Sequence, residues 1–358
     1  MTRGAVIPGT DAKMAAMRER VAVVPIALAV TATLGAADPT PTDSPESDVP
    51  EGTEELFRLE DPRIAESSGL TVSARHGDHY WTHNDSGDIP PEIYAINSDG
   101  ETEATVTLSG PEVEARDWEA ISTGVDDSGE PALYVGDIGD NFQGAWPDIR
   151  VYRLTEPTDL VDQTVEVETF TLRFEDGARD AEGMMVDPRD NRLYVVSKEV
   201  AGGLYAAPET LDPEGVNELS RIGSAPLYST DAAFAADGSH YAIRTYWATT
   251  VFDASEGVPG DNVAHVSLPD SKQGESLAFA PDGTSLLAGT EGEHGPVWSV
   301  PLPEEVTAAG DDTGKGGDQT EPAASPEERS ESASALIWGG IGVAALLVAG
   351  ILLLARRS

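Results

Sequence analysis

The feature that most constrains this chain is a repeated pair of charges, a basic residue three positions before a glutamate at the start of an apolar run. Four copies occur, and a fifth, degenerate copy keeps only the acid: Arg63/Glu66, Arg116/Glu119, Arg179/Glu182, Tyr228/Asp231 and Lys272/Glu275. Successive acids lie 53, 63, 49 and 44 residues apart, close to the length of one blade of a β-propeller. A repeat that preserves charges predicts a face on which those charges converge.

Each repeat also contains short β-rich runs separated by turn residues. In the third copy the first run is followed by a turn at Asp187–Asn191, a second run at Leu193–Val196 and a third at Leu204–Tyr205. Asp, Asn, Gly and Pro between such runs are typical of hairpin turns. A fourth run follows in four of the copies, so we predict an all-β fold, a five-bladed β-propeller with four strands per blade. A six-bladed alternative requires the long second unit to be divided.

The last unit lacks its fourth strand, because the chain after Pro303 has the composition of a linker. An apolar run at Glu55–Leu59 precedes the first unit and belongs to no repeat. We predict that this run is the outer strand of the last blade. It would close the ring and cover an open sheet edge.

Both ends of the chain have the sequence pattern of a membrane-anchored surface protein. Basic residues precede the apolar stretch Val21–Gly35, as in a signal peptide, and an uncleaved anchor is the alternative. The uncharged run Ala335–Ala355 is long enough to span a bilayer, and Arg356-Arg357 after it favours the cytoplasmic side. The predicted order is a signal peptide (1–37), a disordered segment (38–54), an extracellular β-propeller (55–303), a disordered linker (304–334), a transmembrane helix (335–355) and a cytoplasmic tail (356–358). We therefore expect a monomeric, single-pass type I protein of the cell membrane.

Composition excludes several classes of function. The chain has no cysteine, which excludes disulfides, thiol catalysis and cysteine-ligated zinc. Its formal net charge is −42, from 64 acidic and 22 basic residues. Such a surface repels phosphate backbones, so we expect no nucleic-acid partner.

The topology of a propeller predicts where the repeated charges lie. The first strand of each blade lines the central channel, and the loops that precede it share one face with the loops between the second and third strands. We therefore predict a ring of carboxylates at one channel mouth, with these metal ligands: Glu66, Glu119, Glu182, Asp231 and Glu275. The same face carries basic residues that we assign to substrate binding: Arg116, Arg179, Lys198 and Arg244.

Converging carboxylates raise one another's pKa unless a positive charge compensates them. Oxygen-only ligands favour a hard cation, and we expect Ca²⁺. A ring of acids and arginines with a divalent metal also suits a phosphate-ester site, in which Arg116 and Arg179 neutralise phosphoryl oxygens. Alternatively the acids accept backbone N–H groups of the adjacent blade, and the arginines form ordinary ion pairs between blades.

The third unit resembles a blade of the β-propeller phytases and the related esterase-like phytase families. The resemblance rests on Glu182–Asp187, Leu193–Val196, Glu199 and Gly203–Tyr205. It implies a calcium-dependent phosphate-ester hydrolase in which Glu182 and Glu199 bind the metal, and in which Arg179 and Lys198 contact phosphate. The scarcity of lysine and the acidic surface depart from the family pattern and favour a small phosphate monoester over phytate.

Two other classes of function remain open from the sequence. A non-enzymatic surface binding module needs no catalytic residues, and we assign none. A carbohydrate-binding or glycosidase propeller would use aromatic residues placed on the charged face: Trp118, Trp146, Tyr246 and Trp247. The chain lacks the G-x-S-x-G, phosphate-loop and H-E-x-x-H motifs.

Overall fold

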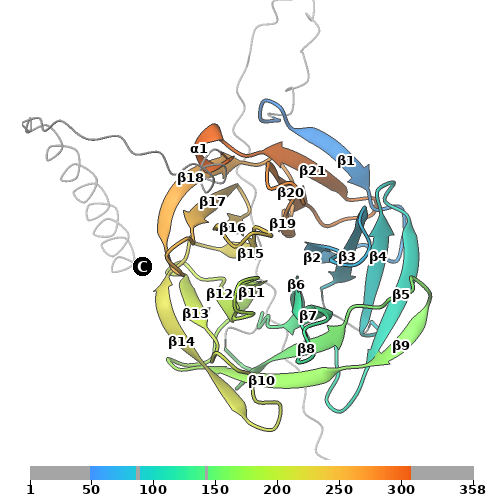
Figure 1. Cartoon of the computed structure of the whole chain (residues 1–358), viewed down its shortest axis with the longest axis vertical. Coiled ribbons are helices and arrows are strands. Elements are labelled where there is room, and N and C mark those ends of the chain that lie inside the picture. The colour runs from blue at the N-terminus through green and yellow to red at the C-terminus, as the bar shows by residue number, and fades with distance from the viewer. Residues whose placement is uncertain (1–48, 86–88, 142–143, 308–358) are drawn as a thin grey trace, which may run out of the picture. The chain divides into compact units, whose positions relative to one another are not determined.

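A computed structural model describes residues 49–85, 89–141 and 144–307, which form 21 strands and one four-residue helix (Figure 1). The first blade holds β2 (Ser67–Val72), β3 (His79–Asn84), β4 (Glu92–Asn97) and β5 (Thr102–Ser109). The second holds β6 (Trp118–Val125), β7 (Pro131–Asp137), β8 (Ile149–Thr155) and β10 (Glu168–Phe174). The third holds β11 (Ala181–Val186), β12 (Leu193–Ser197), β13 (Gly203–Ala206) and β14 (Val216–Ser224). The fourth holds β15 (Ser229–Phe234), β16 (His240–Thr245), β17 (Ala248–Asp253) and β18 (Asp261–Ser267).

The fifth blade confirms the predicted closure of the ring. It holds β19 (Leu277–Phe279), β20 (Ser285–Gly289), β21 (Pro296–Pro301) and the N-terminal strand β1 (Glu54–Arg58). β1 pairs antiparallel with β21, with Glu54 opposite Ser299 and Arg58 opposite Pro296. The innermost strands β2, β6, β11, β15 and β19 each contact the next around the ring, so the described residues form a five-bladed all-β propeller (Figure 1).

Two parallel pairings join neighbouring blades at their outer edges. A short extra strand, β9 (Gln163–Glu166), pairs in parallel with β5 of the first blade, and β10 pairs in parallel with β14 of the third. The second blade therefore lies between two neighbours to which its outer segment is hydrogen-bonded, visible as a belt along the lower edge of Figure 1. This belt accounts for the unusual length of the second repeat.

The core lies between the blades, because both faces of most strands are covered by a neighbouring sheet. One cluster joins the first and second blades and includes Trp81, Ile93, Val135 and Tyr152, each fully buried. Alternating side chains of one strand thus pack into two different clusters, which is the pattern expected for stacked sheets.

The end of the propeller differs from the prediction. The linker was predicted from residue 304, but Glu304–Thr307 form the short helix α1, whose Val306 is buried in the cluster between the fourth and fifth blades. The predicted signal peptide, the transmembrane helix at 335–355 and the cytoplasmic tail lie outside the described residues. Within the part of the chain that the structure describes, no helix is long and apolar enough to cross a membrane.

Candidate cation site at the channel mouth

A β-bulge at the start of four inner strands positions the mouth side chains. In each of these four inner hairpins one residue has no partner across the ladder, and the bulged residues are Ser68, Glu119, Glu182 and Thr230. A bulge redirects the side chain of the extra residue, and bulges recur at barrel rims and next to sites. Glu119 and Glu182 are therefore structurally equivalent, and a serine and a threonine occupy the same place in two other blades.

The repeat read from the sequence is thus out of register in two blades. Glu66 lies two residues before the bulge of its blade and is exposed, and Asp231 lies one residue after the bulge of its blade and is buried. The fifth inner strand begins at Leu277, so Glu275 precedes it, and its side chain is buried. Alignment by acidic residues alone does not account for a bulge, because the extra residue shifts each side chain by one position.

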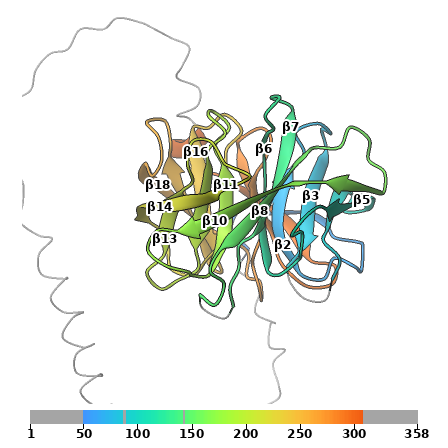
Figure 2. The same ribbon diagram turned by 90° about the horizontal axis from the view of Figure 1, so that it is seen from below.

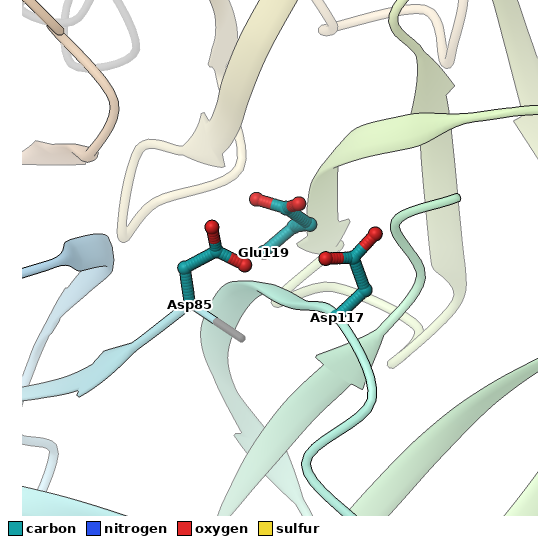
Figure 3. Close-up of side chains that lie close together, drawn as sticks. All are labelled: Asp85, Asp117 and Glu119. Atoms are coloured by element: carbon teal, nitrogen blue, oxygen red, sulfur yellow. The ribbon is translucent and has the colours of Figure 1, made fainter. Parts of the chain in front are cut away.

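Three carboxylates meet on the side of the mouth formed by the first and second blades (Figure 3). One oxygen each from Asp85, Asp117 and Glu119 lies within 4.8 Å of the others. Asp85 follows β3, Asp117 immediately precedes β6, and Glu119 is the bulged residue of β6. Asp117 and Glu119 are buried, whereas Asp85 is partly exposed. We call these three residues the carboxylate cluster.

Neighbouring groups hold two members of the cluster in place. Asn141 donates from its side-chain amide to both oxygens of Asp117 at 3.2 Å. The Ser68 hydroxyl donates to Oε2 of Glu119 at 2.9 Å. A Cβ added at Gly139 would lie 2.5 Å from Oε1 of Glu119 and 2.7 Å from Oδ2 of Asp117. The two carboxylates therefore approach each other over a backbone position that only glycine leaves open.

The electrostatics of the cluster follow from burial and like charge. Burial raises the pKa of Glu119 well above its usual value, and the neighbouring charges of Glu182, Asp85 and Asp117 raise it further. The hydrogen bond from Ser68 acts in the opposite direction and is the weaker effect. An anionic cluster of this kind favours uptake of either protons or a cation.

On the other side of the mouth, Lys198 supplies a positive charge. Its ammonium group pairs with Oε1 of Glu182 and lies 5.2 Å from the ring centre of Tyr246. Burial alone would lower the pKa of Lys198, but the charge and hydrogen bond of Glu182, together with Tyr246 and the charge of Glu275, outweigh burial and raise the pKa. Oε2 of Glu182 and Oε2 of Glu275 are buried and have no hydrogen-bond partner among the described residues. Burial also raises the pKa of both carboxyls.

Asp231 and Arg244 are fully buried within the blade framework. Asp231 accepts the backbone N–H of Ala232 at 2.7 Å and, from the adjacent blade, that of Leu277 at 2.6 Å. Arg244 donates to the carbonyl oxygens of Ser276 and Gly289, and burial lowers its pKa to about 10. These contacts link the fourth blade to the fifth, as in the alternative in which the repeated acids accept backbone N–H groups.

The two predicted arginines next to the inner strands pair with other acids. Arg116 donates from Nε to Asp137 at 2.8 Å. Arg179 pairs with Asp176 at 2.6 Å and with Glu199 at 3.0 Å. The guanidinium groups of Arg116 and Arg179 are therefore both held by acids that lie outside the carboxylate cluster.

The four aromatic residues considered for a carbohydrate site do not form one platform. Trp118 is buried at 1% exposure, and its ring packs against Tyr152. Trp146 lies under the guanidinium of Arg116, 5.0 Å from the ring centre. Trp247 is 64% exposed and adjoins Tyr246. These four residues therefore do not form the stacked pair of tryptophans beside the carboxylates that a glycosidase would need.

Asp85 and Asp117 belong to the cluster but were not among the predicted metal ligands. The available signal was limited: Asp117 stands two residues before Glu119, and Asp85 directly follows the second strand of the adjacent blade. Both positions fall on the predicted charged face. Asp117 recurs as Asp180 in the third repeat. A search for basic and acidic residues three positions apart passes over both of these aspartates, and over Asp85.

Comparison with known proteins identifies no family for this chain. No family model matches it, and no curated protein sequence is significantly similar to it. Among solved structures, it is similar to the RRP9 WD40 repeats, with 11% identity and a TM-score of 0.38, over 72% of this chain and 99% of that one. U3-55K is similar at 12% identity and a TM-score of 0.37, over 69% and 98%. Similarity at this level carries no argument about function, and the propeller assignment rests on the sheets of this structure. The comparisons give no support to the phytase resemblance.

Proposed function

We propose that this propeller is a binding module that takes up a divalent cation, Ca²⁺, through Asp85, Asp117 and Glu119. The observation that carries the proposal is the separation of their oxygens, all within 4.8 Å. Calcium–oxygen distances are about 2.3–2.6 Å, so oxygens on one ion lie at most about 5 Å apart. The three carboxylates fit one ion, with water completing its coordination.

The charge balance around the cluster supports the same proposal. Asp117 and Glu119 are buried, and the nearest predicted basic residues are already paired, Arg116 with Asp137 and Lys198 with Glu182. Buried carboxylates that lack a counter-charge are costly. The unpartnered Oε2 of Glu182 raises the negative charge near Glu119 further. A divalent cation bound by the cluster would supply the counter-charge for Asp117 and Glu119.

The same observations favour a binding module over the phosphate-ester hydrolase that the phytase resemblance implies. Phosphoryl transfer needs cationic groups that are free to neutralise phosphate oxygens. Arg116 and Arg179 are each held by acids of their own blade, Lys198 is paired with Glu182, and Arg244 is buried against carbonyl oxygens. The location at the outer face of a cell membrane remains a prediction from the sequence.

Calorimetric titration of the full-length protein with calcium chloride tests the proposal. We expect saturable binding and a higher melting temperature with calcium. Glu119→Gln and Asp117→Asn should each weaken binding by about tenfold or more. Glu66→Gln is the matched control, since Glu66 lies at the same mouth but is exposed and outside the cluster. If millimolar calcium produces neither heat nor a shift in melting temperature, the cation proposal is wrong.

A further inference from the structure

The channel has a second feature at the end opposite the carboxylate cluster. The inner strands begin at the carboxylate mouth and run toward the other face (Figures 1 and 2). Where they end, a pocket of about 240 Å³ lies on the propeller axis. Every blade contributes to its wall, through Val72, Thr123, Val186, Phe234 and Phe279. The turns that follow these strands complete the opening.

The lining of this pocket differs from the rest of the molecule. The chain has 64 acidic and 22 basic residues, yet every described residue that lines the pocket is uncharged. Leu70, Ile121 and Leu277 contribute apolar side chains. A charged ligand would lose its hydration here without gaining a counter-charge. The pocket therefore selects against ions, in contrast to the opposite mouth.

The lining of the pocket includes four residues with hydroxyl groups, Thr71, Ser73, Ser122 and Thr123, and the hydrogen bonding of Ser122 gives it a directional contact. Ser122 accepts the backbone N–H of Val186 through its Oγ at 3.2 Å. This bond uses an acceptor site of Ser122 and leaves its O–H proton free to donate. The side chain is partly exposed and lines the pocket. A ligand that carries an oxygen acceptor can receive this proton.

We propose that the pocket binds a small, neutral, largely apolar molecule that carries one hydrogen-bond acceptor, such as an aryl ketone. The volume sets the size, because an apolar cavity of about 150 Å³ accommodates benzene. A volume of about 240 Å³ accommodates one ring with a short substituent. The uncharged wall sets the polarity of the ligand, and Ser122 sets its orientation. This site is independent of the cation proposed at the other mouth.

Ligand-observed NMR titration of the full-length protein with acetophenone tests the proposal. Benzoate, of similar size but anionic, is the comparison ligand, and ethylbenzene is the comparison ligand without an acceptor. Ala233→Phe, on the partly buried wall in β15, fills the pocket, and Ala236→Phe, on the exposed turn after it, covers the opening. Val263→Phe, exposed on the outer strand β18, adds the same ring away from the pocket.

We expect saturable binding of acetophenone, at least tenfold weaker in Ala233→Phe and Ala236→Phe and unchanged in Val263→Phe. Ser122→Ala should weaken acetophenone several-fold and leave ethylbenzene unaffected. If Ala233→Phe does not fold, as judged by near-UV circular dichroism, Ala236→Phe decides the matter. The proposal is overturned by an absence of saturable binding, by equal affinity for benzoate, or by unchanged affinity in the folded pocket variants. Dimers in sedimentation that Ala236→Phe abolishes would assign the pocket to a second copy of the chain and also overturn it.

Discussion

Glu291 lies at the carboxylate mouth, where its backbone N–H donates to the carbonyl of Gln273 at 3.0 Å. Burial raises the pKa of its carboxyl to about 7, and the charges of Glu275 and Glu66 add to the shift while Lys198 opposes it. An acid whose pKa is higher in the folded state holds its proton there after the unfolded chain has lost it. Its contribution to stability is therefore complete below about pH 4.5 and is lost as pH rises to about 7.

Replacing this residue should remove that pH dependence. We expect Glu291→Gln to gain stability relative to the wild type as pH rises from 5 to 8, by about 1 kcal/mol or less, since the half-exposed side chain is screened by solvent. Thermal denaturation across this pH range measures the difference. Glu293→Gln, two residues away and exposed, is the control. A difference between Glu291→Gln and wild type that does not change with pH would contradict the assignment.

At the residue scale the sequence predicts part of the mouth. The glutamates of the second and third repeats occupy equivalent bulges, because in both inner strands the extra residue of the bulge is the glutamate itself. The acids of the first and fourth repeats do not, and the bulge there carries Ser68 and Thr230. A bulge has no residue signature of its own, so its position could not be read from charge spacing. Asp85 joins the cluster through a contact between blades, which no local pattern encodes.

The closing strand β1 contributes one buried aromatic side chain to the ring. Phe57 is 6% exposed, and its ring centre lies 5.0 Å from that of Tyr80 in the first blade. Its neighbour Leu56 points the other way and is 42% exposed. Phe57 therefore couples the fifth blade, to which β1 is hydrogen-bonded, to the first blade, against which its side chain packs.

We expect Phe57→Ala to lower the free energy of unfolding by about 3 kcal/mol, through loss of buried area and the cavity left behind. Leu56→Ala, on the exposed side of the same strand, should change it by about 0.5 kcal/mol or less. Chemical denaturation with a single transition measures both. Equal effects of the two substitutions would show that β1 does not hold the ring closed.

At the element scale the closure was predictable because an unmatched apolar run and a missing strand occur at opposite ends of the repeats. The parallel pairings of the outer belt were not predictable from the sequence. β9 and β10 follow one another along the chain, but β9 pairs in parallel with β5 of the first blade, whereas β10 pairs antiparallel with β8 of its own blade and in parallel with β14 of the third. Such pairings join segments that share no hairpin, so turn chemistry does not mark them. In the sequence, only the unusual length of the second repeat indicates this belt.

The whole molecule carries a formal net charge of −42. Mutual repulsion among surface carboxylates opposes the compact state, and salt screens it. We therefore expect the melting temperature at pH 7 to rise by several degrees between about 0.01 M and 0.5 M sodium chloride. Differential scanning calorimetry in the presence of a chelator separates this effect from calcium binding. The rise should shrink near pH 4, where many carboxylates are protonated, and a fall in melting temperature with salt at pH 7 would contradict the prediction.

The pairing of β1 with β21 also determines the order in which the ring can be assembled. Glu54 lies opposite Ser299, so the first strand to leave the ribosome is hydrogen-bonded to one of the last. A nascent chain carries β1 without its partner until nearly every blade has been made. Contacts of such long range are slow to form, and the ring cannot close before β21 has been synthesised. A chain that ends before β21 leaves β1 without its hydrogen-bonded partner and leaves the first blade without its neighbour on that side.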